Sequence, residues 1–211
     1  MKRVINLDNW NRKEHFKFFS ALDDPFWGIT MTVDFTSIYQ QSKNMEVSFF
    51  LYSVHFLLKC INATTAFKLR IENGEVVEYD KINISPTIGR EDGTFGFGFF
   101  EYNTDLSLFI ENAEKEIHRV KNSTGLSFSK DTARADVIRY SALPWFAFSE
   151  MKHAGSIQTG DSIPKISTGK LIQEKKKLLL PISISVHHGL VDGRNVAEFI
   201  QNVKDGQNNT L

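Results

Sequence analysis

Two adjacent histidines near the end of the chain are the residues best suited to proton transfer. His187 and His188 are followed, four residues after the second, by Asp192 and then by a glycine. A neutral imidazole can accept a proton near pH 7, so either histidine could serve as a general base. The structural alternative is that Asp192 only caps a helix and that a histidine here is a satisfied core residue.

The sequence around the two histidines predicts a strand that leads into a helix. Residues 178–186 are apolar, and their Ile-Ser-Ile-Ser-Val part alternates with period two, which is typical of a strand. Beyond Gly193 the apolar positions recur at helical spacing: Val196, Phe199, Ile200 and Val203. Because neighbouring strand residues point to opposite faces, only one of the two histidines is expected to face a cleft at the strand end.

The pattern His-His-x-x-x-Asp-Gly resembles the signature of the chloramphenicol acetyltransferases, a family of CoA-dependent acyltransferases. The resemblance implies that His188 is the general base and that Asp192 is structural. A related signature, Asp-His-Arg-x-x-Asp-Gly, belongs to the dihydrolipoamide acyltransferases. His187-His188-Gly189 places this chain with the first group.

Two further stretches are similar to the same family. The N-terminal Trp-x-Arg-x-Glu-His-Phe contains Arg12, which the resemblance pairs with Asp192; the alternative is a solvated helix charge. The segment Ser-Ala-Leu-Pro-Trp starts at Ser141 and ends at Trp145. There the resemblance implies that the Ser141 hydroxyl stabilises the oxyanion and that Trp145 lies along the CoA channel. The alternative for Ser141 is an ordinary turn serine.

The resemblance also assigns acceptor and cofactor positions. Acceptor-binding aromatic residues are expected at Phe18, Phe19, Phe95 and Phe128, and cofactor-binding residues at Trp145, Lys170 and Ser167. Several positions depart from the family pattern: Phe19 and Leu171 each replace a usual tyrosine, Ser167 a threonine, Phe97 a small residue and His153 an aliphatic one. These departures leave acetyl transfer as the expected chemistry and concern the choice of acceptor.

Composition sets the broader expectations. The chain has 211 residues, is 41% hydrophobic and has a formal net charge of +0, which argues against nucleic acid or an acidic membrane as the main partner. Cys60 is the only cysteine, so no internal disulfide and no cysteine metal cluster are expected, and its apolar surroundings suggest a small buried hydrophobe. Without a secretion signal or an apolar run of roughly 18 residues, the chain is expected to be cytoplasmic.

We expect a single domain over residues 1–211. The resemblance implies a two-layer α/β sandwich with a mixed β-sheet, assembled as a homotrimer with active sites between subunits, with acetyl-CoA as cosubstrate and no metal. Apolar patterns predict helices at 10–19, 36–41, 48–61 and from Asp105 onward, and a hairpin at 67–71 and 75–79. Further strands are predicted at 3–7, 27–35, 82–88, 93–100, 136–140, 164–173 and 177–186, with a long loop at 153–164.

Three functions remain in competition at this point. The first is acetyl transfer to a hydroxyl of chloramphenicol, and the second is the same chemistry on a different hydroxyl acceptor. The third is a catalytically silent small-molecule binding protein on the same scaffold. A serine hydrolase is disfavoured because the sequence has no Gly-x-Ser-x-Gly motif.

Overall fold

A computed structural model describes residues 1–155 and 160–208 of the chain. Its helices are α1 (Lys13–Ser20), α2 (Thr36–Asn44), α3 (Phe49–Ala63), α4 (Leu106–Lys121) and α5 (Gly193–Asn208), with short 3-10 turns at Leu7–Asn9 and Thr65–Lys68. Its strands are β1 (Lys2–Val4), β2 (Phe26–Asp34), β3 (Leu69–Glu72), β4 (Glu75–Tyr79), β5 (Asn83–Gly89), β6 (Phe95–Phe97), β7 (Val137–Ala142), β8 (Lys165–Thr168), β9 (Ile172–Glu174) and β10 (Lys177–His187).

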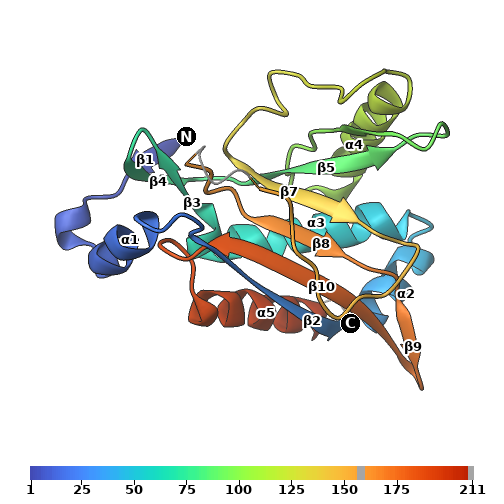
Figure 1. Cartoon of the computed structure of the whole chain (residues 1–211). Coiled ribbons are helices and arrows are strands. Elements are labelled where there is room, and N and C mark those ends of the chain that lie inside the picture. The colour runs from blue at the N-terminus through green and yellow to red at the C-terminus, as the bar shows by residue number, and fades with distance from the viewer. Residues whose placement is uncertain (156–159, 209–211) are drawn as a thin grey trace.

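The described residues build two layers, a mixed sheet and a helical layer that covers one of its faces (Figure 1). The large sheet has the order β2-β10-β8-β7-β5-β6, and β9 pairs with β10 to one side. Strands β5, β7 and β8 run parallel to one another, and the other pairs in this sheet are antiparallel. A smaller sheet has the order β1-β4-β3. The predicted two-layer α/β sandwich with a mixed β-sheet is therefore confirmed.

The long strand β10 links the predicted motif to the sheet. It pairs with β2 from Leu179 to His187 and with β8 from Ile182 to Ser185. Its isoleucines face the helical layer, where they are buried, while its serines face the other side. That second face, which we call the open face, carries no helix among the described residues (Figure 1).

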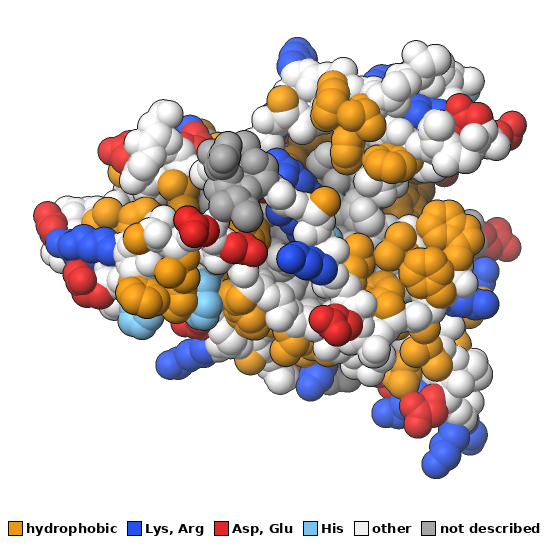
Figure 2. Space-filling view, viewed as in Figure 1, with side chains coloured by type: hydrophobic (Ala, Val, Ile, Leu, Met, Phe, Trp, Pro, Cys, Tyr) orange, Lys and Arg blue, Asp and Glu red, His pale blue; other side chains and the backbone are white. Residues whose placement is uncertain are grey.

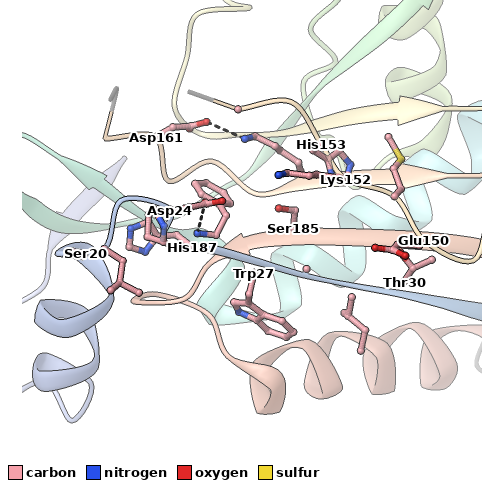
Figure 3. A pocket seen from close by; sticks show the side chains of 18 of the residues that line it. Ser20, Asp24, Trp27, Thr30, Glu150, Lys152, His153, Asp161, Ser185 and His187 are labelled. Atoms are coloured by element: carbon pink, nitrogen blue, oxygen red, sulfur yellow. Dashed lines mark hydrogen bonds and ion pairs between the residues drawn. The ribbon is translucent and has the colours of Figure 1, made fainter. Parts of the chain in front are cut away.

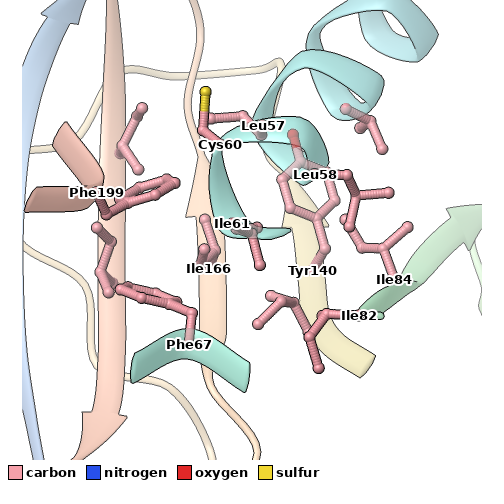
Figure 4. Packing of buried hydrophobic residues seen from close by; sticks show 14 of the residues in the cluster. Leu57, Leu58, Cys60, Ile61, Phe67, Ile82, Ile84, Tyr140, Ile166 and Phe199 are labelled. Atoms are coloured by element: carbon pink, nitrogen blue, oxygen red, sulfur yellow. The ribbon is translucent and has the colours of Figure 1, made fainter. Parts of the chain in front are cut away.

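Helix α3 forms the middle of the core, as its uniformly apolar sequence predicts. It packs on the sheet in the middle of the helical layer and contacts helices α2, α4 and α5. Leu57, Leu58 and Ile61 project from α3 toward Tyr140 and Ile166 on the strands (Figure 4). Such interdigitation is the main source of stability in a domain of this size.

Some element boundaries differ from the prediction for local reasons. The strand predicted over 93–100 is limited to β6, because Gly93 takes a φ of 82° in a turn and only an isolated bridge joins Phe100 to β5. The strand predicted over 164–173 is split, because the Lys170 amide bonds Phe146 O instead of continuing the ladder. The hairpin at Asn73-Gly74 is confirmed, and both residues take the positive φ that this turn needs.

The first helix begins at Lys13 and not at Trp10. Asn6 accepts a hydrogen bond from the Asp8 amide and opens a 3-10 turn, which delays the helix and shortens the first strand. Across the described ranges, the structure contains no helix that is both long enough and apolar enough to cross a bilayer.

Candidate active site

His188 follows directly after the end of β10 and is held by its neighbours on several sides. Its amide donates to Pro25 O at 2.8 Å, and its imidazole stacks on the Phe19 ring with centroids 3.8 Å apart and planes 10° apart. The Trp27 ring lies 5.5 Å away on the helical side. Its Nδ1 is buried and has no hydrogen-bond partner among the described residues, so Nε2 is the nitrogen left for proton exchange.

Asp192 performs both of the roles that the sequence allowed. Its Oδ1 accepts from the amides of Arg194 and Asn195 and so caps α5, while its Oδ2 pairs with Nη1 of Arg12. Nη2 of Arg12 also donates to the carbonyl oxygen of His188 at 3.2 Å. Burial would raise the pKa of Asp192, but the bonds from Arg12 and the two amides lower it below its usual value. Arg12 and Asp192 thus fix the loop that carries His188.

His187 lies on the open face, away from His188, as the strand alternation predicts. It is buried at 3% exposure, and its ring meets Phe26 edge-on with centroids 5.9 Å apart. Burial lowers the pKa of His187 to about 4, so the imidazole is neutral at pH 7. Its Nδ1 accepts from the Gly189 amide at 3.2 Å, which leaves the ring proton on Nε2.

Ser141 projects from β7 onto the open face within a row of hydroxyl groups. Thr87 Oγ1 on β5 lies 3.3 Å from Ser141 Oγ, and Ser167 is the register partner of Ser141 on β8. Ser167 Oγ in turn lies 2.9 Å from Nε2 of His153. Sequence reasoning missed Thr87, although its place in an alternating strand puts it on the same face as Ser141.

The structure does not bring Ser141 and His188 together within one chain. Ser141 lies across β8 from Ser183 of β10, and His188 is five residues further along β10. At about 3.3 Å per residue and 4.8 Å per strand, the two side chains are separated by roughly 19 Å. A single copy therefore cannot place both groups on one reacting carbonyl.

The predicted acceptor residues fall into two groups. Phe18 and Phe19 meet edge-on at 5.2 Å on α1, beside His188. Phe97 of β6 stacks on Phe128 with ring centroids 5.4 Å apart, and it meets Phe95 of the same strand with centroids 5.8 Å apart. Phe18 and Phe128 are 65% and 70% exposed, which is unusual for such large apolar side chains.

Two of the predicted cofactor residues, Trp145 and Lys170, lie together beyond the end of β7, whereas Ser167 is buried within β8. Trp145 is 73% exposed, and its segment runs beside residues 169–171 because Lys170 bonds Phe146 O at 3.0 Å. Lys170 is exposed, whereas Leu171 packs against the core. Figure 2 shows hydrophobic side chains gathered at this edge of the open face.

A cavity of about 690 Å³ lies on the open face beside His187. Strands β2, β8 and β10 form its floor, and the segment from Ser149 to Gly155 forms one wall. His153 and Lys152 approach it from above, while Ser185 and His187 project from β10 (Figure 3). Apart from the alternating serines of β10, no sequence pattern indicates this cavity.

Comparisons with known proteins give the same family that the sequence motifs resemble. The family model described as "Chloramphenicol acetyltransferase" matches residues 2–204. The chain is 27% identical to "Chloramphenicol acetyltransferase 3" of Escherichia coli over 208 residues, covering 98% of this chain and 97% of that protein. It is 28% identical to the "Chloramphenicol acetyltransferase" of Clostridioides difficile over 205 residues, covering 95% and 93%.

Solved structures give the same result at the level of the fold. A structure titled "chloramphenicol acetyltransferase" superposes with a TM-score of 0.89 at 29% identity, covering 98% of this chain and 99% of that one. A probable dihydrolipoamide acetyltransferase from Listeria monocytogenes superposes with a TM-score of 0.69 at 13% identity, covering 99% and 94%. The second likeness concerns the fold alone.

Proposed function

The chain belongs to the chloramphenicol acetyltransferase family, and from that premise we propose that it transfers acetyl from acetyl-CoA to a hydroxyl of chloramphenicol. As a member it is an acyltransferase, and the family uses acetyl-CoA as cosubstrate. The observation that carries the proposal is the imidazole of His188, which is stacked on Phe19 with only Nε2 left for proton exchange.

His188 would act as the general base. Its Nε2 takes the proton from the acceptor hydroxyl while the hydroxyl oxygen attacks the thioester carbonyl. The carbon–sulfur bond then breaks, and the CoA thiolate leaves with the proton that His188 held. Both substrates are present together, and general-base assistance of this kind contributes roughly 10²–10⁴-fold to the rate. Arg12 and Asp192 would support the reaction only by holding the backbone at His188.

Ser141 would donate a hydrogen bond to the oxyanion of the tetrahedral intermediate, a contribution of about 3 kcal/mol. Because Ser141 and His188 of one chain lie roughly 19 Å apart, the serine must come from a second copy. We therefore propose a homotrimer with active sites between subunits. Light scattering at micromolar concentration should give three times the chain mass, and a monomeric mass would refute the shared site.

The two aromatic groups would then form the two walls of one acceptor pocket. Phe18 and Phe19 lie beside the base, and Phe95 and Phe128 beside the serine of the neighbouring copy. Trp145, Lys170 and Ser167 would line the CoA side. The exposure of these apolar rings in the single chain fits a surface that a second copy or a substrate covers.

The test is a thiol-release assay with acetyl-CoA and chloramphenicol. We expect His188→Ala to lower kcat by roughly 10²–10⁴-fold while the oligomer still binds CoA, since only the base is removed. His15→Ala, on the exposed face of α1, is the matched control and should keep the wild-type rate. Comparable turnover of His188→Ala and wild type would remove the general-base role.

A different hydroxyl acceptor is the second candidate. Nε2 of His153 is within hydrogen-bond distance of the Ser167 hydroxyl, and Ser167 lies one strand from Ser141. His153 thus places a polar imidazole where the family pattern has an aliphatic side chain, on this part of the open face. The same assay with a panel of hydroxyl compounds separates the two candidates, because only the true acceptor gives the highest kcat/KM.

A further inference from the structure

Arg90 follows directly after β5 and donates hydrogen bonds to three neighbouring segments of the chain. Its Nε donates at 2.9 Å to Val120 O, at the C-terminal end of α4, and its Nη1 donates at 3.1 Å to Thr94 Oγ1, in the turn before β6. Its Nη2 donates to Ser127 Oγ and, at 3.3 Å, to Ser123 Oγ, both in the loop after α4. A guanidinium can bind such separate acceptors at once because its five donors form a fixed planar fork, whereas a lysine has three donors on one atom.

The loop after α4 is closed by further contacts around Ser127. Its Oγ lies 2.6 Å from Ser123 Oγ, which itself donates to Val120 O at 2.8 Å. Ser127 has a φ of 56°, a left-handed conformation that is unfavourable for a residue with a side chain and that surrounding contacts must stabilise. The amide of Phe97 on β6 donates to Leu126 O at 2.9 Å, so the strand and the loop are joined through the backbone as well.

Gly96 lies between the strand and these side chains. It is buried on β6, and a Cβ built on it would be 2.5 Å from Nη2 of Arg90 and closer still to Oγ of Ser127. The space that a side chain would need is therefore filled by the arginine and the serine, and the glycine permits this close approach. We call Arg90, Ser123 and Ser127 the arginine clamp.

The arginine clamp joins the two backbone segments that carry three aromatic side chains. Phe95 and Phe97 belong to β6, and Phe128 directly follows Ser127. The rings of Phe97 and Phe128 stack with centroids 5.4 Å apart and planes 19° apart, while Phe128 is 70% exposed. A ring that is packed on one side only takes its position mainly from its backbone, so the hydrogen bonds of Arg90 determine where Phe128 lies.

We propose that Arg90 is a positioning residue for the acceptor, because the arginine clamp fixes Phe128 relative to Phe95 and Phe97. This inference rests on the proposed function, in which these rings form the wall of the acceptor pocket beside Ser141. Arg90 acts through the rings and not by contact with the reacting atoms. Its replacement should therefore weaken the binding of the acceptor and leave the binding of acetyl-CoA unchanged, since the predicted CoA residues lie on other segments.

Titration calorimetry with chloramphenicol and, separately, with acetyl-CoA tests the role of the arginine clamp. Arg90→Lys keeps the charge but not the fork, so we expect it to bind chloramphenicol roughly 10-fold more weakly and acetyl-CoA as well as the wild type does. Gly96→Ala should have the same effect although it keeps the arginine, because its methyl group displaces Arg90 and Ser127. Arg134→Lys is the matched control: it removes a fork that bonds Asp136 outside the clamp, and it should keep both affinities.

Kinetics and amide hydrogen exchange distinguish positioning from a general loss of stability. In Arg90→Lys the KM for chloramphenicol should rise by the same roughly 10-fold with kcat nearly unchanged, since the base and the oxyanion donor are not part of the clamp. Exchange should become faster at residues 94–98 and 122–128 and remain at the wild-type rate in α3. Equal chloramphenicol affinity in Arg90→Lys and wild type, or an equal loss of acetyl-CoA affinity, would overturn the proposal.

The affinities also separate this proposal from the proposed function. Wild-type protein that binds chloramphenicol without acetylating it would refute the proposed chemistry, while the affinity of Arg90→Lys would still decide the role of Arg90. Wild-type protein that binds no chloramphenicol would overturn both.

Discussion

Replacement of Asp192 separates its two roles, because its two oxygens have different partners. Oδ1 caps α5 and Oδ2 pairs with Arg12. Asp192→Asn keeps an amide oxygen that caps nearly as well as a carboxylate, but it removes the charge opposite Arg12. Asp192→Ala removes both. The difference between the two variants therefore isolates the cap, and the loss in Asp192→Asn isolates the ion pair.

The exposure of the pair sets the size of the effect. The side chains of Arg12 and Asp192 are 16% and 32% exposed, which lies between a surface pair and a fully buried one. Exposed pairs contribute about 0–1 kcal/mol, and breaking a buried pair costs about 3–5 kcal/mol. We expect Asp192→Asn to lose about 2 kcal/mol of unfolding free energy and Asp192→Ala about 3 kcal/mol, since a lost cap costs about 1 kcal/mol.

Urea unfolding at pH 7 and at lower pH measures both losses. Because the folded state lowers the pKa of Asp192, its stabilisation is complete above the unfolded value of about 3.9 and disappears as the pH falls further. The difference between wild type and Asp192→Asn should therefore shrink below about pH 4. Asp8→Asn is the control, since Asp8 pairs with Lys13 on the surface and its loss should leave the unfolding curve unchanged. An unfolding curve for Asp192→Asn that coincides with wild type at pH 7 would refute the pairing argument.

Three further predictions concern buried groups. Arg70 is fully buried and donates to four backbone carbonyls, so Arg70→Met should cost at least about 3 kcal/mol in urea unfolding, and wild-type stability would contradict this. Burial raises the pKa of Cys60 to about 12, so its thiol should react with a disulfide reagent at pH 8 only after unfolding; rapid reaction of the native protein would show an accessible thiol. Burial lowers the pKa of His187 to about 4, so the wild type should lose up to about 3 kcal/mol as the pH falls from 6.5 toward 4. His187→Gln should lack this part of the pH dependence, and an identical dependence in both proteins would show that His187 is not its source.

Much of the site could be predicted from local sequence alone. The alternation in 178–186 and the helical spacing after Gly193 placed the histidines at the junction of a strand and a helix, which is where β10 ends and α5 begins. Period-two alternation also separated His187 from His188, since this geometry is a property of any strand. The pairing of Arg12 with Asp192, 180 residues away in the chain, came from the family resemblance and not from the local pattern, and the structure places the two together.

Boundaries were less predictable, because they depend on hydrogen bonds that local sequence does not report. The strand after Pro164 ends at Thr168 because Lys170 bonds Phe146, a residue of a distant segment. The first helix starts late because residues Leu7–Asn9 form a 3-10 turn just before it. In each case a polar contact competes with the apolar pattern.

Only the tertiary structure decided which chemical groups share a space. Strand register separates Ser141 from His188 by roughly 19 Å. A site that uses both residues therefore needs a second copy of the chain. The same register sets Lys165 beside Ser185 on the open face of the sheet, where its ammonium lies 3.5 Å from Oδ2 of Asp161. A sequence records which side chains alternate along each strand, but the pairing of strands far apart in the chain determines which of them meet.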